Sequence, residues 1–426
     1  MLNKYRDNNS FKSSRSRSAS ALSSDNLSRR HRPDYVLIII ATLLSLIGLI
    51  VVYAISPGLA ATKDVDENYF VTKQATSVLL GFLAFGIFSY ISIKSLKRSK
   101  NMLLGLSAIG VLVVQFFGEE VNGAYRWIQI GGLSFQIAEL IKFTIIIWGA
   151  CFLVERLRKG EVDNFKKTLQ PLLILLVIVG IVVAVMESDL GSTGVMFAIV
   201  AIMAFTAGLP LRQIGILAGI VAIVTILLVS TTAYRRERFA TFLNPTTDCQ
   251  DAGYQACQAL IAVGSGGIVG KGLGNSVQAY GYLPEPQNDS IFAILAEKFG
   301  FLGVTTVIVL YVALFARLKR IIERTAEPFA RLFVVGVLAW ISVQTMINIG
   351  AMIGVLPLKG ITLPFISYGG TSILFVMGAL GVVSQISRYT AFEPIRNASV
   401  KKGNKNDNRS LRERVGRTHY ATSSRR

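Results

Sequence analysis

Residues that could do chemistry are concentrated in a few polar segments of an otherwise apolar chain. In one segment, Gln136, Glu139 and Lys142 recur every three residues at the start of an apolar stretch, shortly after Arg126 and Trp127. This spacing places the three on one side of a helix within two turns. Charged groups near a membrane span line a polar cavity or pair with one another. Two interpretations are therefore possible. These residues line a substrate cavity, or Glu139 and Lys142 form a structural pair while Arg126 and Trp127 act as an interfacial anchor.

Two further carboxylates lie where predicted helices begin. Asp189 stands between two apolar stretches, and it could cap the helix that follows it. Asp289 directly precedes another long apolar stretch, close to Glu285. A cap is one interpretation of Asp289 as well. The other is a general base, because partial desolvation raises the pKa of a carboxylate and makes it a better proton acceptor.

A glycine-rich segment, 264–276, invites comparison with a phosphate-binding loop, but the spacing fails. Ser265 stands where the first glycine is needed, and Gly272 follows Lys271 where Ser or Thr is required. Glycines can still let backbone N–H groups approach a lipid-linked phosphate. In that interpretation, Lys271 and the arginines of 235–238 attract a pyrophosphate.

The elements that must position these groups are apolar stretches long enough to cross a bilayer, which takes about 20 residues. The hydrophobic share is 52% and the charged share only 16%, which is typical of a membrane protein rather than a soluble domain. We therefore predict an all-α polytopic membrane protein with about ten spans. Their ranges are roughly 35–55, 70–91, 101–117, 137–154, 169–186, 190–207, 212–231, 290–314, 330–352 and 367–387.

Positive charge decides the predicted orientation. Lys and Arg are concentrated in loops 92–100, 155–168 and 315–329 and in both tails, all of which fall on one side if there are ten spans. The positive-inside rule makes that side the cytoplasm. The loop 232–289, between spans seven and eight, is then extracytoplasmic. The number of spans depends on the short connections at 187–189 and 208–211. If the two spans there were one broken helix, every later loop would lie on the opposite side of the membrane.

The formal net charge of +19 does not indicate nucleic-acid binding, because it follows the topology. We predict a membrane domain over 35–388 between two disordered basic tails, 1–34 and 389–426, that contact anionic lipid headgroups. Cys151 lies in an apolar span, and we interpret it as an unreactive residue that packs against its neighbours. Cys249 and Cys257 are eight apart in the outer loop, and a disulfide between them remains open.

Two features lie late in the chain. Gln344 and Asn348 are four residues apart in span nine and share a face, which predicts hydrogen bonds between helices. The glycine- and proline-rich segment 354–371, which contains Ser367, is predicted to re-enter the membrane. Irregular backbone at that depth is tolerated only where it is buried in protein or lines a polar cavity.

Taken together, these motifs resemble the SEDS family (shape, elongation, division and sporulation proteins), the lipid II polymerases, over residues 35–390. Five segments occur in the family's order: Arg126-Trp127 leading to Lys142, Ser188-Asp-Leu-Gly191, Gly253-Tyr-Gln255 with the glycine run, Pro284-Glu285…Asp289, and Leu363-Pro-Phe-Ile-Ser367-Tyr-Gly-Gly370. Segments 274–278 and 359–364 resemble the division branch more than the elongation branch. The family's catalytic aspartate corresponds to Asp289.

The chain departs from the family pattern at several positions. The family generally has His and a small hydroxyl residue before the aspartate and Phe after it, whereas this chain has Gln287, Asn288 and Ser290. The proline of the family's Gln-Pro-Ser-Glu is replaced by Ile137. The charged members are retained at each site, so we interpret the chain as a divergent lineage that keeps the activity.

The resemblance implies a peptidoglycan glycosyltransferase that joins lipid-linked disaccharides outside the membrane. An acceptor 4-hydroxyl attacks the donor's anomeric carbon, and undecaprenyl pyrophosphate leaves as a stable anion. One base can then suffice, whereas a glycosidase also needs an acid. We expect Asp289 to act as general base or metal ligand, with no cofactor beyond a possible Mg²⁺ or Mn²⁺. The expected substrate-binding residues are Arg126, Gln136, Glu139, Lys142, Asp189, Lys271, Glu285 and Ser367.

The resemblance also implies a class B penicillin-binding protein and other division-complex membrane proteins as partners, at the septum of a bacterial plasma membrane. Two other functions stay open. A lipid flippase or transporter would use a similar charged cavity but needs polar groups through the full membrane thickness. A non-catalytic scaffold would make no glycan from lipid II.

Overall fold

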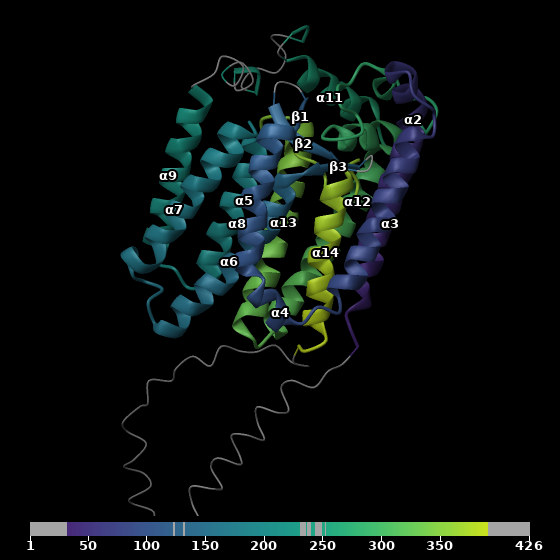
Figure 1. Cartoon of the computed structure of the whole chain (residues 1–426). Helices are drawn as coiled ribbons and strands as arrows, with labels where there is room; N and C mark the ends of the chain where they lie inside the picture. Colours follow the sequence, from purple (N-terminus) through teal and green to yellow (C-terminus); the bar gives the residue numbers. More distant parts are fainter. Residues whose placement is uncertain are drawn as a thin grey trace, which may run out of the picture.

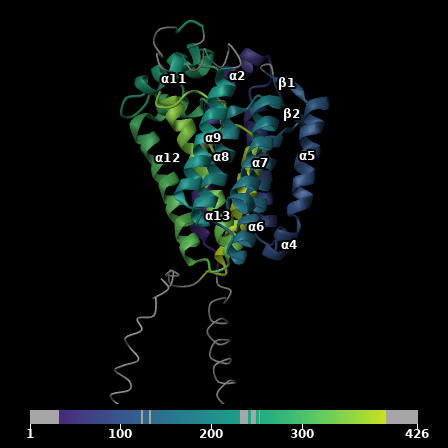
Figure 2. The same ribbon diagram turned by 90° about the vertical axis from the view of Figure 1, so that its left-hand side faces the viewer.

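The computed structural model describes residues 32–121, 124–130, 133–230, 236, 240–242, 249–251 and 253–390. The predicted tails therefore lie almost wholly outside the described residues. Figure 1 shows a bundle of helices that run along a common direction, with a small sheet at one end. Figure 2, turned by 90°, shows α5 at one side of the bundle and α12 at the other.

Among the described residues, ten apolar helical segments form the bundle, and they confirm the predicted fold class. Eight are long and apolar enough to span a membrane. They are α2 (Tyr35–Lys63), α3 (Tyr69–Phe88), α5 (Lys100–Phe117), α6 (Ile137–Lys159), Phe165–Ala184, α12 (Ile291–Arg324), α13 (Pro328–Met352) and α14 (Gly370–Ser387). The other two are α8 (Leu190–Thr206) and α9 (Leu211–Ser230), whose apolar stretches, Leu190–Thr206 and Leu211–Leu227, are shorter. Phe165–Ala184 comprises η1 (Phe165–Leu169), α7 (Gln170–Val179) and the first part of η2 (Gly180–Met186).

The joins on which the count depended are real breaks between helices. Asp189 caps α8, since its Oδ1 accepts a hydrogen bond from the Ser192 N–H at 2.9 Å. The chain turns between α8 and α9 at Gly208, whose φ of +97° suits glycine. Pro210 follows directly before α9, where proline is tolerated because it precedes the helical hydrogen bonds. Two antiparallel helices therefore replace the single broken helix that would have reversed the later loops.

The described chain ends lie together at one end of the bundle (Figure 1). The Asp34 N–H donates to Ser387 Oγ at 3.0 Å, so the start of α2 touches the end of α14. The short helix α4 (Ile93–Arg98) is tied to the start of α13 by a Lys97–Glu327 ion pair of 2.7 Å. Two of the predicted basic loops, 92–100 and 315–329, thus meet at the same end.

A three-stranded antiparallel sheet, absent from the all-α prediction, lies at the opposite end. Its order is β1-β2-β3, formed by β1 (Glu119–Val121), β2 (Ala124–Ile130) and β3 (Leu133–Gln136). Trp127 pairs with Gln136 in the register. Because β3 runs directly into α6, the sheet brings the Arg126–Trp127 segment beside the first turns of α6.

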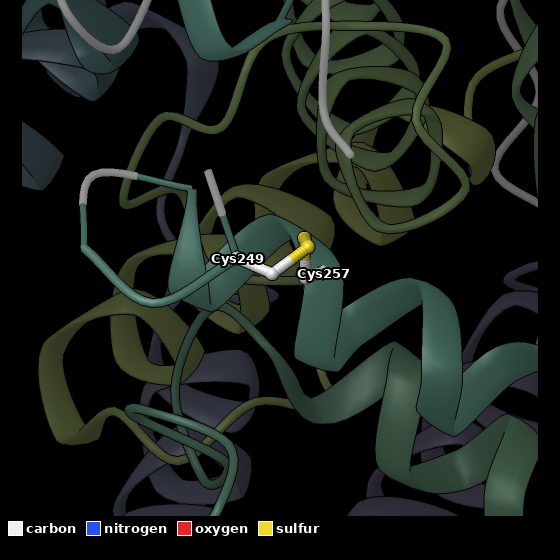
Figure 3. The surroundings of a disulfide bond; sticks show 2 residues. All are labelled: Cys249 and Cys257. Carbon is white, nitrogen blue, oxygen red and sulfur yellow. A yellow bond between two sulfur atoms is a disulfide. The ribbon is translucent and has the colours of Figure 1, made fainter. Parts of the chain in front are cut away.

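The long segment between α9 and α12 also contains regular structure, namely α11 (Tyr254–Ser265) and η3 (Gln278–Tyr280). Cys257 of α11 forms a disulfide with Cys249, with the two Cα atoms 5.6 Å apart (Figure 3). The bond that the sequence left open is therefore present. Cys151 is a free, half-buried cysteine in α6.

The glycine run packs backbone against backbone instead of presenting N–H groups to a phosphate. The Lys271 and Gly272 N–H groups donate to the main-chain oxygens of Glu297 and Lys298 at 2.9 and 3.0 Å. A Cβ at Gly270 would lie 2.2 Å from the Lys298 oxygen, and α12 is interrupted at Gly300, where φ is +62°. These glycines are needed for the close approach, which corrects the phosphate interpretation of this run.

Glycines also allow α14 to pack closely against α3. A Cβ at Gly381 of α14 would lie 2.5 Å from the main-chain oxygen of Phe85 in α3. Apolar helices gain little from the hydrophobic effect when they associate within lipid, so small residues that permit close backbone contact take a larger share of the packing.

Gly381→Ala is expected to destabilise the bundle, because overpacking a well-packed contact costs about 1–3 kcal/mol. Gly86→Ala, in α3, is the matched control, since a Cβ there meets nothing within 4 Å. Thermal unfolding in detergent should show a melting temperature several degrees lower for the first variant only. Equal melting temperatures for the two variants would contradict the packing argument.

Candidate active site

A polar cavity of about 140 Å³ lies where the sheet, α6, α13 and the segments before α12 and α14 meet. Six of the nine residues predicted for the site line this cavity: Arg126, Gln136, Glu139, Lys142, Glu285 and Asp289. They come from two of the five sequence motifs, at positions up to 163 residues apart in the chain, and Tyr368 of a third motif lines the same cavity.

Glu139 and Lys142 form an ion pair inside the bundle. Lys142 Nζ lies 2.7 Å from Glu139 Oε1 and 3.0 Å from Gln344 Oε1, and both charged side chains are almost fully buried. Glu139 Oε2 has no hydrogen-bond partner among the described residues. The structural pair and the cavity lining are therefore the same residues, with one buried carboxylate oxygen left to accept a donor from a ligand.

Two amide side chains of α13 hold the loops that close the cavity. Gln344 Nε2 donates to the Thr362 main-chain oxygen at 3.0 Å. Asn348 Nδ2 donates to the main-chain oxygens of Asp289 and Ile361, at 2.8 and 2.7 Å. The predicted hydrogen bond between helices exists, since Gln344 Oε1 accepts from Lys142 of α6. The two amides also join α13 to the loops that contain Thr362, Asp289 and Ile361.

Asp289 lies in a segment that is tied down on several sides. Ser290 occupies the cap position of α12, so the Asp289 side chain faces the cavity one residue before the cap. The Asn288 oxygen accepts a hydrogen bond from Ser367 Oγ at 2.6 Å, and the Tyr368 N–H donates to the Gln287 oxygen at 2.8 Å. Ser367 therefore supports the Asp289 segment and does not itself line the cavity.

The residues that depart from the family pattern hold a second carboxylate. Glu285 Oε2 accepts from Gln287 Nε2 at 3.1 Å and from Asn288 Nδ2 at 2.6 Å. Ser290 Oγ donates to the Pro284 oxygen at 2.9 Å. Glu285 has a positive φ of +47°, an uncommon conformation for a side-chain-bearing residue. The two amides thus help keep Glu285 beside Asp289.

Arg126 binds the turn that precedes α8. Its Nε and Nη2 donate to the main-chain oxygens of Glu187 and Ser188 at 2.6 and 2.8 Å. Gln136 Nε2 lies 3.4 Å from Asp189 Oδ2, so Asp189 both caps α8 and contacts a residue that lines the cavity. Arg126 therefore acts as a clamp between β2 and the turn, and not only as an interfacial anchor.

Two groups at this end have shifted pKa values. Burial raises the pKa of the Glu187 carboxyl to about 8, the negative charge of Asp189 adds to the rise, and Arg126 opposes it. The Glu187 carboxyl oxygens have no hydrogen-bond partner among the described residues. Burial likewise raises the pKa of Tyr368 to about 12, with a smaller contribution from Tyr69.

Lys271 lies apart from the cavity, contrary to its expected role. Its ammonium group pairs with the buried carboxylate of Glu297 at 3.3 Å. Glu297 also accepts from Ser276 Oγ and from the Val277 N–H. Lys271 thus stabilises the outer loop. Arg235 and Arg238 lie outside the described residues, and Arg236 is exposed.

A divalent cation is compatible with the carboxylates in the cavity. Mg²⁺ is usually held by one or two carboxylates together with water and substrate phosphates. Glu285 and Asp289 line the same cavity and would be the protein ligands. The part of the chain that the structure describes holds no group of three or more His, Cys, Asp or Glu side chains that could hold a metal without such help.

Several residues of the site were not selected as site residues from the sequence. Trp127, Asn288, Gln344, Thr362 and Tyr368 line the cavity. Most of them lie inside the motifs on which the family resemblance is based, so those motifs could have identified them as site residues. Gln255 Nε2 lies 3.5 Å from Asp289 Oδ2, although 34 residues separate them in the chain. Only the folded structure shows that contact.

Comparison with known proteins gives consistent matches. The family of FtsW, RodA and SpoVE proteins, described as cell cycle proteins, matches residues 34–391. A probable peptidoglycan glycosyltransferase FtsW of Nitrosomonas europaea is 38% identical over 365 residues, which cover 83% of this chain and 93% of that protein. Stage V sporulation protein E of Bacillus subtilis is 35% identical over 85% of this chain and 99% of its own length.

Solved structures agree with these matches. A chain of a peptidoglycan synthase complex that coordinates polymerization and crosslinking superposes with a TM-score of 0.68 at 26% identity, covering 84% of this chain and 98% of that one. The rod shape determining protein RodA of Thermus thermophilus gives a TM-score of 0.61 at 25% identity, with 84% and 97% covered. Because sequence and fold agree over the whole bundle, the chain belongs to the FtsW, RodA and SpoVE family, as the SEDS resemblance predicted.

Proposed function

We propose that the polar cavity is the active site at which this peptidoglycan glycosyltransferase polymerises lipid II into glycan strands during cell division. The observation that carries the proposal is the meeting of Asp289, the buried Glu139–Lys142 pair and Arg126 in one cavity. The relatives named as probable FtsW peptidoglycan glycosyltransferases, and the likeness to a peptidoglycan synthase complex, support the reaction class and the division role.

Asp289 takes the role of general base in this proposal. The acceptor's 4-hydroxyl gives its proton to the Asp289 carboxylate while its oxygen bonds to the donor's anomeric carbon. The bond from that carbon to undecaprenyl pyrophosphate breaks, and the pyrophosphate leaves with the electron pair. The hydrogen bond from Asn348 to the Asp289 main chain fixes the base in position, which general base catalysis requires.

Charge balance distinguishes the basic residues of the cavity. The positive charge of Lys142 is compensated by Glu139 at 2.7 Å. Arg126 instead donates to the neutral main-chain oxygens of Glu187 and Ser188, so its positive charge can act on the pyrophosphate. A bound Mg²⁺ or Mn²⁺ at Glu285 and Asp289 would supply further neutralisation of the leaving group.

The position of the polar groups favours an enzyme over a transporter. The cavity residues lie at the end of the bundle that carries the sheet. Beyond Lys142, the buried part of α6 continues with the uncharged Thr144 and with the apolar Phe143 and Ile145–Ile147. A transporter would need charged or strongly polar groups further along this path. Formation of glycan strands from lipid II by the purified protein would separate the enzyme from both a transporter and a scaffold.

The orientation and partners complete the proposal. Disulfides persist outside the cytoplasm, so Cys249–Cys257 supports an extracytoplasmic position for the cavity end. Both chain ends are then cytoplasmic, together with the basic loops at the opposite end. The likeness to a peptidoglycan synthase complex supports a class B penicillin-binding protein as partner at the septum. The substrate is lipid II, and the tails contact anionic lipid.

Asp289→Asn keeps the size of the side chain but removes the base. Polymerisation of lipid II, measured as glycan product on gels, is expected to fall by at least about 100-fold, since general base catalysis contributes about 10²–10⁴-fold. Asp163→Asn, at an exposed position near η1, is the control and should keep the wild-type rate. A wild-type rate for the Asp289 variant would show that another group is the base.

Lys142→Met tests whether the buried pair has more than a structural role. Removing one partner of a buried pair typically costs about 3–5 kcal/mol, because the other charge is left uncompensated. Adding Glu139→Gln should restore most of the thermal stability but not the polymerase activity.

The control for this pair lies on the same helix. Lys159→Met breaks the exposed Lys159–Glu155 pair of 2.6 Å, and exposed pairs contribute little to stability. Both stability and activity should be unchanged. Wild-type activity in the Glu139→Gln/Lys142→Met protein would reduce the buried pair to a packing element.

Glu187 predicts a dependence on pH. Its carboxyl is neutral below about pH 8 and ionises above it. Ionisation places a second negative charge beside Arg126 and Asp189, so kcat/KM is expected to fall as the pH rises through about 8. Because the folded-state pKa is raised from 4.5, the neutral form stabilises the fold, and thermal stability should also fall as the pH rises toward 8. Glu187→Gln should flatten both profiles, and unchanged profiles would contradict this role.

A further inference from the structure

The amino-terminal turn of α11 approaches the side chain of Asp289 from the outer segment. Gln255, the second residue of α11, directs its amide nitrogen to Asp289 Oδ2 at 3.5 Å and to Ser290 Oγ at 3.2 Å. Asn348 and Ser367 hold the main chain of the same segment. Gln255 instead contacts the carboxylate, which is the group proposed to accept the proton.

The same turn is held by the disulfide. Cys257 is two residues after Gln255 and is 5% exposed, whereas its partner Cys249 is exposed. Figure 3 shows the bond joining the first turn of α11 to the chain that precedes it. The cap residue of α11, Gly253, provides no side-chain hydrogen bond to the helix. The crosslink therefore restrains a turn that lacks the usual polar cap.

We propose that Gln255 is a positioning residue for Asp289 and that the Cys249–Cys257 disulfide holds it there. This inference rests on the proposed role of Asp289 as the reacting base. The amide N–H donates to Oδ2 and fixes the orientation of the carboxylate that is proposed to accept the proton. When the crosslink is absent, the turn gains conformational freedom, and the Gln255 amide spends less time on the carboxylate.

Positioning and substrate binding separate in the kinetics. Gln255 does not line the cavity with the residues proposed to bind substrate. Its loss should therefore lower kcat and leave KM for lipid II within about twofold. A hydrogen bond to a charged group accounts for about tenfold in rate when it acts in the reacting state, so Gln255→Ala is expected to lower kcat about tenfold.

Cys249→Ala removes the crosslink with the least disturbance, because Cys249 is exposed and Cys257 keeps its buried place. The expected result is a kcat about three- to tenfold lower, KM for lipid II unchanged, and a melting temperature near that of the wild type. Cys151→Ala, which removes the free cysteine in α6, is the control and should keep wild-type kinetics. Labelling of the unfolded, unreduced protein with a maleimide should detect one thiol in the wild type and two in Cys249→Ala.

The double variant Cys249→Ala/Gln255→Ala shows whether the disulfide acts through Gln255. We expect a kcat no lower than that of Gln255→Ala alone, because the crosslink has nothing left to position. Losses that multiply would overturn the link between the two. A wild-type kcat for Gln255→Ala would overturn the positioning role, even where Cys249→Ala fails to fold.

Asp289→Asn in the same assay separates this inference from the proposed function. If Asp289→Asn is inactive while Gln255→Ala is fully active, only the positioning role fails. If Asp289→Asn polymerises lipid II normally, the assignment of the base fails first, and the positioning role fails with it.

Discussion

A buried ion pair between Glu139 and Lys142 lies at the point where the elements of the active-site end meet. Charges inside an apolar bundle are costly unless they are paired and hydrogen-bonded. Here Gln344 of α13 gives Lys142 a second acceptor and in turn donates to the re-entrant segment at Thr362. The need to satisfy one ammonium group therefore fixes the distance between α6, α13 and the loop that closes the cavity.

The second part of this framework holds the segment of Asp289, the proposed base. Asn348, one turn after Gln344, binds the main chain of both Asp289 and Ile361, so a single side chain links the two irregular segments of the site. Irregular backbone within a membrane bundle requires such partners, because no water is present to satisfy its polar groups. The side chains that stabilise the fold here are the same ones that position the proposed catalytic carboxylate.

The departures from the family pattern form a local network of their own. Gln287 and Asn288 both donate to Glu285, and Ser290 donates to the Pro284 main chain. Replacing a group that can be charged with neutral amides keeps a second carboxylate near Asp289 without adding a titrating partner. The chain therefore keeps both carboxylates of the motif in one cavity, as expected for a divergent but active lineage.

Sequence and tertiary structure determined different parts of this protein. Hydrophobic runs and charge patterning predicted ten helices with boundaries close to those of α3, α5 and α13, because burial in lipid constrains composition along the chain. Spacing on one helix also predicted that Glu139 and Lys142 would meet.

The small sheet was missed, since its short strands stand in a polar connection. Lys271 was assigned to substrate, because its partner Glu297 lies 26 residues away. Only the tertiary structure decided two further features, the contact of Gln255 with Asp289 and the Cys249–Cys257 bond. Both depend on where α11 packs, and a local sequence pattern does not determine that position.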